Sequence, residues 1–90
     1  MVFGEVAWDE ASEAHVARHA VTPDEVEDVL FSRPRLVQSG PYATTYVMGR
    51  SLAGRYLFVV VAEAARGGVY VVTAREMTEA ERRRFRRRAR

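Results

Sequence analysis

The chain contains no cysteine and no lysine, and none of its apolar runs is long. The absence of cysteine excludes disulfide bonds and thiolate metal ligands, and it suits a reducing cytoplasm. No apolar run approaches the ~20 residues that a membrane-spanning helix needs, and the amino terminus lacks a signal-peptide pattern. We therefore expect a cytoplasmic protein that makes no use of a membrane.

Because lysine is absent, all fourteen cationic side chains are arginine. A GC-rich genome is the simpler explanation of this bias, and selection for the fork-shaped guanidinium, which fits phosphate, is the other. The charge is also uneven: residues 1–31 hold eight carboxylates and one arginine, a net −7, whereas residues 32–90 hold thirteen arginines and four carboxylates, a net +9. The basic part predicts a polyanionic partner.

The length and composition indicate one domain. The chain has 90 residues, of which 48% are hydrophobic and 29% charged, which suits a small globular protein with a single core. No repeat or linker divides it, so we expect a single domain over residues 1–90.

The apolar pattern is clearest in the carboxyl-terminal half. Residues 57–61 are apolar at consecutive positions, as in a central strand with both faces covered. A second run, 69–72, follows Gly67 and Gly68, which supply the positive φ of a tight reversal. The predicted antiparallel strands cover 44–50, 55–63 and 68–75, with short strands at 2–8 and 35–38.

Capping residues mark the predicted helices. Asp9 and Thr22 each precede a segment with apolar residues at helical spacing, and Glu25 completes a capping box with Thr22. Thr78 and Glu81 repeat this box before the arginine-rich end. The predicted helices cover 10–20, 22–32 and 79–88. The fold class is therefore α+β, with two amino-terminal helices, an antiparallel sheet of about four strands and a carboxyl-terminal basic helix.

Two histidines, His15 and His19, stand four residues apart on one face of the first predicted helix. A zinc site needs a third ligand, and the chain has no further histidine or cysteine. A carboxylate could complete the set, but we expect neither a metal nor a cofactor. An imidazole also titrates near neutrality, so either histidine can act as an acid or base, or simply form a hydrogen bond within the fold.

Arginines gather at one end of the predicted sheet. In an antiparallel meander, Arg50, Arg55 and Arg75 fall at the same end, where they can bind a phosphate or simply protect strand ends from association. The arginines around Phe85 likewise form a polyanion-binding surface or a solvated helix. Three tyrosines of the sheet are either core residues or outward-facing platforms for stacked bases: Tyr46, Tyr56 and Tyr70.

Several motifs occur in a distinctive order along the chain. They are Trp8-Asp9-Glu10, Arg18-His19-Ala20-Val21 before Thr22-Pro23-Asp24-Glu25, Gly49-Arg50, and Thr73-Ala74-Arg75-Glu76-Met77-Thr78 before Glu81-Arg82-Arg83. In this order the chain resembles the BrnT family of toxins, small RelE-like ribonucleases of bacterial toxin–antitoxin pairs. The resemblance covers nearly the whole chain. Family members often have lysine where Ser12 stands and glycine where Ala20 stands.

The resemblance implies a RelE-like fold and a metal-independent endoribonuclease, a hydrolase that binds RNA. It also implies a co-produced ribbon-helix-helix antitoxin that holds the toxin inactive, with operator DNA bound only through that antitoxin. The alternative is a non-catalytic RNA- or protein-binding domain on the same scaffold.

For such an enzyme we assign phosphate binding to Arg50 and Arg75 and proton transfer to His19. RNA is cut without a metal when its own 2′-hydroxyl attacks the adjacent phosphate, so the protein must stabilise charge and move protons. The flanking phosphates are assigned to Arg55 and to three residues of the basic helix: Arg82, Arg83 and Arg86.

Overall fold

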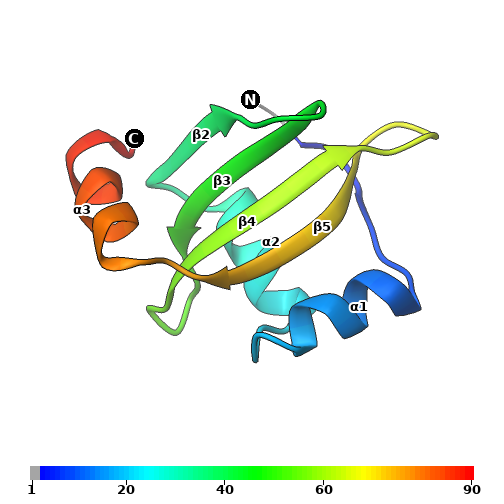
Figure 1. Cartoon of the computed structure of the whole chain (residues 1–90), viewed down its shortest axis with the longest axis horizontal. Helices are drawn as coiled ribbons and strands as arrows, with labels where there is room; N and C mark the ends of the chain where they lie inside the picture. The colour runs from blue at the N-terminus through cyan, green and yellow to red at the C-terminus, as the bar shows by residue number, and fades with distance from the viewer. Residues whose placement is uncertain (1–2) are drawn as a thin grey trace.

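The computed structural model describes residues 3–90, which form one sheet with helices on both of its faces (Figure 1). The strands are β1 (Val6–Ala7), β2 (Arg35–Ser39), β3 (Thr44–Arg50), β4 (Tyr56–Glu63) and β5 (Val69–Glu76). The helices are α1 (Glu10–Ala17), α2 (Pro23–Phe31) and α3 (Glu79–Arg88). The predicted α+β class, the three helices and the three long strands are confirmed.

The strand order is β1-β5-β4-β3-β2, with β4 in the centre as its consecutive apolar residues predicted. Strands β2 to β5 are antiparallel neighbours. The expectation of about four antiparallel strands is corrected, because the described residues form five strands and β1 joins β5 in parallel. A parallel pair needs a long connection between its two strands, and here α1, α2 and three strands lie between β1 and β5 in the chain. The strand predicted over 2–8 is reduced to Val6–Ala7, and residue 2 lies outside the described residues.

Alternate residues of β4 face two different cores. Leu57 and Val59 pack with the buried residues of α1 and α2. Phe58 faces the opposite side, where Met77 and Phe85 bring the start and the middle of α3 onto the sheet. Figure 1 shows α2 behind the sheet, α1 beneath β5 and α3 across one end of the other face. Beyond that end, no helix of the described residues packs on this second face.

Gly68 allows the turn between β4 and β5 to seat β1. Gly67 and Gly68 have φ values of +90° and +72°, left-handed values that glycine adopts without a Cβ clash. A Cβ on Gly68 would lie 2.2 Å from the carbonyl oxygen of Glu5. The same oxygen accepts the N–H of Val69 at 2.9 Å. A side chain at position 68 would therefore push β1 away from β5.

All three helices begin with a capping box. Those of α2 and α3 are the predicted threonine–glutamate pairs. In α1 the partners are Asp9 and Ser12, each of whose side chains accepts the backbone N–H of the other. Ser12 is only 2% exposed. The serine at the position where the resembled family often has lysine is therefore a buried part of the helix start.

The first helix ends three residues earlier than predicted, at Ala17, in a Schellman motif. The N–H of Val21 donates to the carbonyl of Val16 at 3.1 Å, and the N–H of Ala20 donates to the carbonyl of Ala17 at 2.9 Å. Ala20 has a φ of +57°, a conformation that glycine usually takes at this position. Val16 and Val21 are both buried and supply the apolar contact that accompanies the motif.

Candidate nucleic-acid interface

The candidate site lies on the face of the sheet that α3 covers at one end. The strand register places Arg50 opposite Tyr56, and Phe58 between Met48 and Arg75 in the next row. Side chains two residues apart on β4 share a face, so Tyr56 and Phe58 are neighbours. Arg50 and Arg75, predicted at the same end of the sheet, therefore lie on the same face in adjacent rows.

Tyr56 is surrounded by three guanidinium groups. The Cζ atoms of Arg50, Arg82 and Arg86 lie 5.1, 4.5 and 5.3 Å from the centroid of its ring. The ring of Phe85 meets it edge-on at 5.8 Å. Arg82 and Arg86 are four residues apart on α3, so one face of that helix presents both to the phenol. We call Arg50, Tyr56, Arg82 and Arg86 the Tyr56 cluster.

The arginines of this cluster change the acidity of the phenol. A hydrogen bond from Arg86, together with the charges of Arg50, Arg86 and Arg82, outweighs burial and lowers the pKa of Tyr56 below its ordinary value of 10. The hydrogen bond and the arginine charges each stabilise the phenolate. At a given pH a larger fraction of Tyr56 is therefore ionised than of an ordinary tyrosine, and the phenolate is the form that can accept a proton.

The three arginines of the Tyr56 cluster form no ion pair with a carboxylate of the described residues. Within residues 3–90 the ion pairs are Arg55–Glu25, Arg55–Glu76 and Arg75–Glu81. None of them involves an arginine of the cluster. A hollow of about 190 Å³ opens beside Tyr56 and is lined by Gly54, Arg55, Tyr56, Glu76, Met77 and Arg82. The cluster therefore offers an anion three arginine side chains around one phenol, and one of them, Arg82, lines the hollow.

Arg75 is held differently from the arginines of the cluster. Its Cζ atom lies 4.3 Å from the centroid of the Phe58 ring, and that ring contacts Tyr46 at 4.9 Å. Its two terminal nitrogens donate to the two carboxylate oxygens of Glu81 at 2.8 and 3.0 Å. The hydrogen bonds from Arg75 are the largest effect on the Glu81 carboxyl. They outweigh burial and lower its pKa. The guanidinium fork assigned to the phosphate is thus occupied by the carboxylate of Glu81, at the start of α3.

Arg55 lies on the other face of the sheet. Its guanidinium donates to both carboxylate oxygens of Glu25, at 2.9 and 3.0 Å, and to the carbonyl of Ala20 at 2.8 Å. Burial alone would raise the pKa of Glu25, but hydrogen bonds from Thr22 and Arg55 outweigh it and lower that pKa. Arg55 therefore ties β4 to the helical layer. It shares an end of the sheet with Arg50 and Arg75, as predicted, but not a face.

His19 also belongs to the helical layer. It is exposed in the turn after α1, between Val16 and Val21, which are buried behind the sheet. Its ring lies 6.3 Å from that of His15. The structure does not bring His19 together with Arg50 and Arg75, whose side chains lie on the opposite face. No group of three or more histidine, cysteine or acidic residues among residues 3–90 is placed to hold a metal ion.

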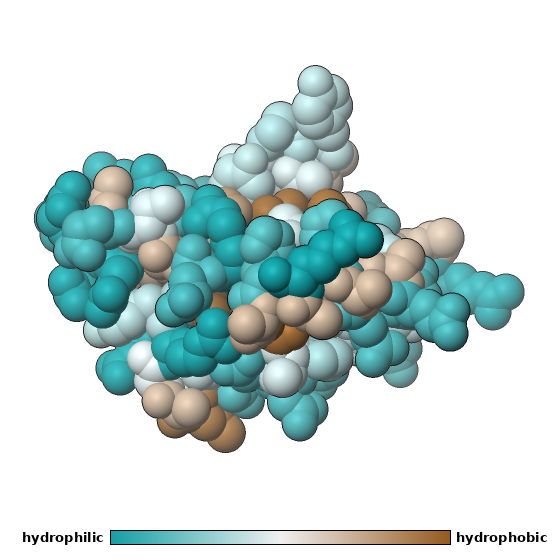
Figure 2. Space-filling model, turned by 60° about the horizontal axis from the view of Figure 1, so that its bottom comes forward, coloured by the Kyte–Doolittle hydropathy of each residue, from teal (hydrophilic) through white to brown (hydrophobic). Residues whose placement is uncertain are grey.

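The basic helix presents more than one surface. Arg82 and Arg86 turn toward Tyr56, whereas Arg83 is exposed to solvent. In Figure 2 the left end of the molecule, where α3 lies in Figure 1, is covered mainly by hydrophilic residues. No helix within residues 3–90 is long and apolar enough to cross a membrane.

Tyr56 is the residue whose importance the sequence concealed. It was foreseen as a core or stacking tyrosine, not as the centre of an arginine cluster. The available signal was the pairing of two features: a tyrosine at the start of the central strand and arginines four apart on the last helix. Joining them requires knowing that α3 folds back over the end of β4, which Met77 and Phe85 bring about.

Comparisons of the chain with protein-family models, with curated proteins and with solved structures find no match. The assignment of a function therefore depends on the geometry of the Tyr56 cluster and on the motifs of the chain itself.

Proposed function

We propose that the protein is a metal-independent endoribonuclease, the toxin of a type II toxin–antitoxin pair of the BrnT kind within the RelE-like class. Its antitoxin is a ribbon-helix-helix protein that holds it inactive and through which the complex binds operator DNA. The enzyme acts on RNA in the cytoplasm. The observation that carries the proposal is the Tyr56 cluster, in which three arginines without carboxylate partners surround a phenol of lowered pKa.

The cluster can perform the chemistry of cleavage by the RNA itself. The ionised phenol of Tyr56 takes the proton of the 2′-hydroxyl, whose oxygen attacks the adjacent phosphorus. Arg50 and Arg82 stabilise the negative charge that develops on the non-bridging oxygens. The 5′ oxygen departs and takes a proton from solvent, which leaves a 2′,3′-cyclic phosphate and a 5′-hydroxyl. Proton transfer of this kind contributes about 10²–10⁴-fold to a rate.

Arg75 keeps its proposed role in binding phosphate, with one added condition. A phosphate in reach of its fork must replace the carboxylate of Glu81, which bonds both of its terminal nitrogens. The stacking of Arg75 on Phe58 persists in either state, because it uses the face of the guanidinium and not its N–H groups. His19 is the alternative proton-transfer group and requires an RNA that reaches both layers of the protein.

The test is cleavage of a labelled RNA in the presence of EDTA. We expect the wild type to cut, and Tyr56→Phe and Arg50→Ala each to lose about a hundredfold or more in rate, while His19→Ala stays close to the wild type. Arg75→Lys keeps the charge and removes the fork, so it separates a bidentate contact from a simple positive charge. Circular dichroism must show that every variant is folded. A folded wild type that cuts no RNA and does not slow growth on expression contradicts the proposal.

The engagement of Arg75 by Glu81 favours a second candidate, a non-catalytic RNA-binding domain on the same scaffold. A carboxylate in the fork is a natural arrangement where no scissile phosphate is bound. This candidate predicts RNA binding that weakens steeply with salt and no cleavage by any variant.

A further inference from the structure

The outer edge of β2 offers unpaired backbone groups. β2 is the last strand of the sheet and has five residues, whereas β1, at the opposite edge, has two. In an antiparallel pair, successive residues alternately bond to the neighbouring strand and point away from it. Arg35 bonds outward, so Val37 and Ser39 also point their N–H and C=O groups outward. Within residues 3–90 no backbone group beyond the β2–β3 ladder pairs with those two residues.

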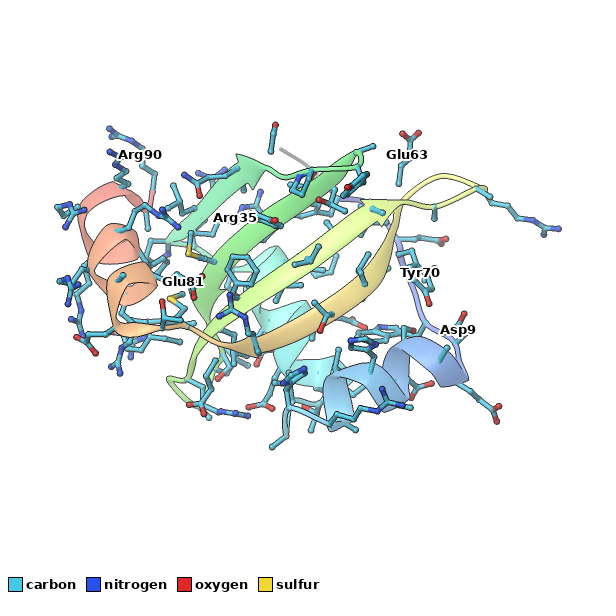
Figure 3. All side chains as sticks on the ribbon, in the orientation of Figure 1. Asp9, Arg35, Glu63, Tyr70, Glu81 and Arg90 are labelled. Atoms are coloured by element: carbon cyan, nitrogen blue, oxygen red, sulfur yellow. The ribbon has the colours of Figure 1, made fainter. Side chains whose placement is uncertain are left out.

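The last residue of the chain shows that this edge accepts an extended segment. α3 ends at Arg88, and Ala89 has an extended backbone with φ −67° and ψ 142°. The N–H of Arg90 then donates to the carbonyl of Arg35 at 3.0 Å, and the N–H of Arg35 donates to the carbonyl of Arg90 at 3.3 Å. Figure 3 labels both residues on the side of the molecule that carries β2 and the end of α3. Arg90 and Arg35 thus already pair as two residues of adjacent antiparallel strands do, and the β2 edge continues beyond them to Ser39.

The surroundings of this edge are basic and apolar. A hollow of about 300 Å³ lies between β2 and the end of α3, lined by Arg33, Arg35, Leu36, Val37, Arg88 and Arg90. Arg35 itself contacts the carbonyl of Leu30 and the ring of Phe3. No ion pair to a carboxylate within residues 3–90 involves Arg33, Arg88 or Arg90. These three cations therefore remain available to a negatively charged ligand.

We propose that the β2 edge is the docking site of an extended, acidic segment of a partner protein, which adds to the sheet beside Val37 and Ser39. Backbone hydrogen bonds hold such a segment in register, and its carboxylates face the arginines of the hollow. RNA would satisfy the charge but has no row of amides to continue the ladder, so the edge favours a peptide. That the partner is the antitoxin rests on the proposed function, whereas the mode of docking does not.

The experiment uses the full chain labelled with nitrogen-15 and a defined probe, an acetylated and amidated octapeptide of alternating valine and glutamate. We expect the peptide to slow hydrogen exchange of the Val37 and Ser39 amides by roughly tenfold or more, as new hydrogen bonds do. Val37→Pro removes one outward donor at a position where an edge strand tolerates proline. Because that variant can fail to fold, a peptide N-methylated along the bonding edge tests the same bonds on the wild type.

Charge is tested by Arg88→Glu, which lies in the hollow, against Arg83→Glu, which is exposed on the same helix outside it. We expect the first to weaken peptide binding at least several-fold more than the second. Equal binding of the N-methylated peptide, absence of binding, or protection of the two amides by a short RNA in place of the peptide would each overturn the proposal. Cleavage of RNA is measured on the same preparation, so a chain that binds the peptide without cutting RNA contradicts only the proposed function.

Discussion

The carboxylate of Glu81 makes two connections at once. Its oxygens accept both hydrogen bonds from Arg75, at 2.8 and 3.0 Å, and one of them also accepts the N–H of Thr78 at 2.8 Å. A single side chain thereby caps α3 and neutralises the arginine that stacks on Phe58. Any ligand that takes Arg75 from Glu81 also acts on the start of the helix that supplies Arg82 and Arg86 to the Tyr56 cluster.

Glu81→Gln is expected to strengthen RNA binding. Glutamine keeps the capping oxygen but removes the negative charge, so Arg75 becomes available to a phosphate. In a non-cleaving Tyr56→Phe background, the slope of log K against log salt steepens by about 0.7, the increment for one further phosphate contact on a single strand. Fluorescence anisotropy of a labelled RNA over a salt series measures it. Glu79→Gln, in the same first turn of α3, is the control, and an equal slope in both variants would refute the exchange.

Acid is expected to destabilise the protein through Glu25 and Glu81. The pKa of each is lower in the folded protein than its ordinary value of 4.5. Such a group contributes stability above the unfolded pKa, and this contribution is lost as pH falls through the folded pKa. Urea unfolding between pH 6 and pH 3 should show that decline, and Glu81→Gln should show less of it. Glu79→Gln is the control and should decline like the wild type. If Glu81→Gln declines as steeply as these two, the Arg75–Glu81 pair does not contribute to the stability of the folded protein.

The phenol of Tyr56 is expected to titrate earlier than an ordinary tyrosine. The hydrogen bond from Arg86 has the largest effect, and together with the nearby arginine charges it lowers the pKa of this phenol below 10. Arg86→Ala should move this titration upward, whereas Arg87→Ala, one residue away on α3, should move it little. The absorbance of the phenolate at alkaline pH gives the curve, and Tyr56→Phe identifies its contribution among the four tyrosines. If Arg86→Ala leaves the curve unchanged, the hydrogen bond does not act on the phenol in solution.

Arg55→Ala is expected to affect stability and to leave RNA binding unchanged. Its guanidinium bonds Glu25 and the carbonyl of Ala20 on the helical side of the sheet. Loss of these charged hydrogen bonds costs about 1–3 kcal/mol, measured by urea unfolding. RNA affinity is then measured at a temperature where the variant is fully folded. A drop in affinity comparable with that of Arg50→Ala would restore Arg55 to the RNA-binding surface.

Ala20→Gly is expected to stabilise the protein. A left-handed alanine costs ~1–2 kcal/mol, and the greater freedom of glycine in the unfolded chain takes back ~0.5–1 kcal/mol, so the net gain is about 1 kcal/mol or less. Ala14→Gly, in the interior of α1, is the matched control and should lose ~0.5–1 kcal/mol. Denaturant unfolding compares the two. A loss of stability in Ala20→Gly would show that the strain is relieved in solution.

The features that followed from the sequence are those with local causes. The capping residues Thr22 and Thr78 fixed where α2 and α3 begin, and the five consecutive apolar residues from Leu57 fixed the central strand. The early end of α1 has a local cause too, but its signal was weakened, because alanine occupies the position where glycine would mark a helix end.

The face of the sheet on which each site residue lies could not be predicted in the same way. Arg55 and Tyr56 are adjacent in the chain, and a shift of one residue in the turn before them would exchange the faces that they occupy. The pairing of Arg75 with Glu81 depends on the sharp corner between β5 and α3. Side chains six residues apart meet there only because the strand stops at Glu76. Neither feature has a signature in spacing alone.

The Tyr56 cluster and the row beside it draw every residue from positions 46–86, and the first 31 residues supply none. The helical layer supports the back of the sheet through apolar contacts that many sequences can provide. Substitutions on the exposed surfaces of α1 and α2 can therefore accumulate without altering the Tyr56 cluster. Relatives of this chain that keep the Tyr56 cluster should differ most in their first third, and a search that weights residues 44–86 should find them more readily than one that weights the chain evenly.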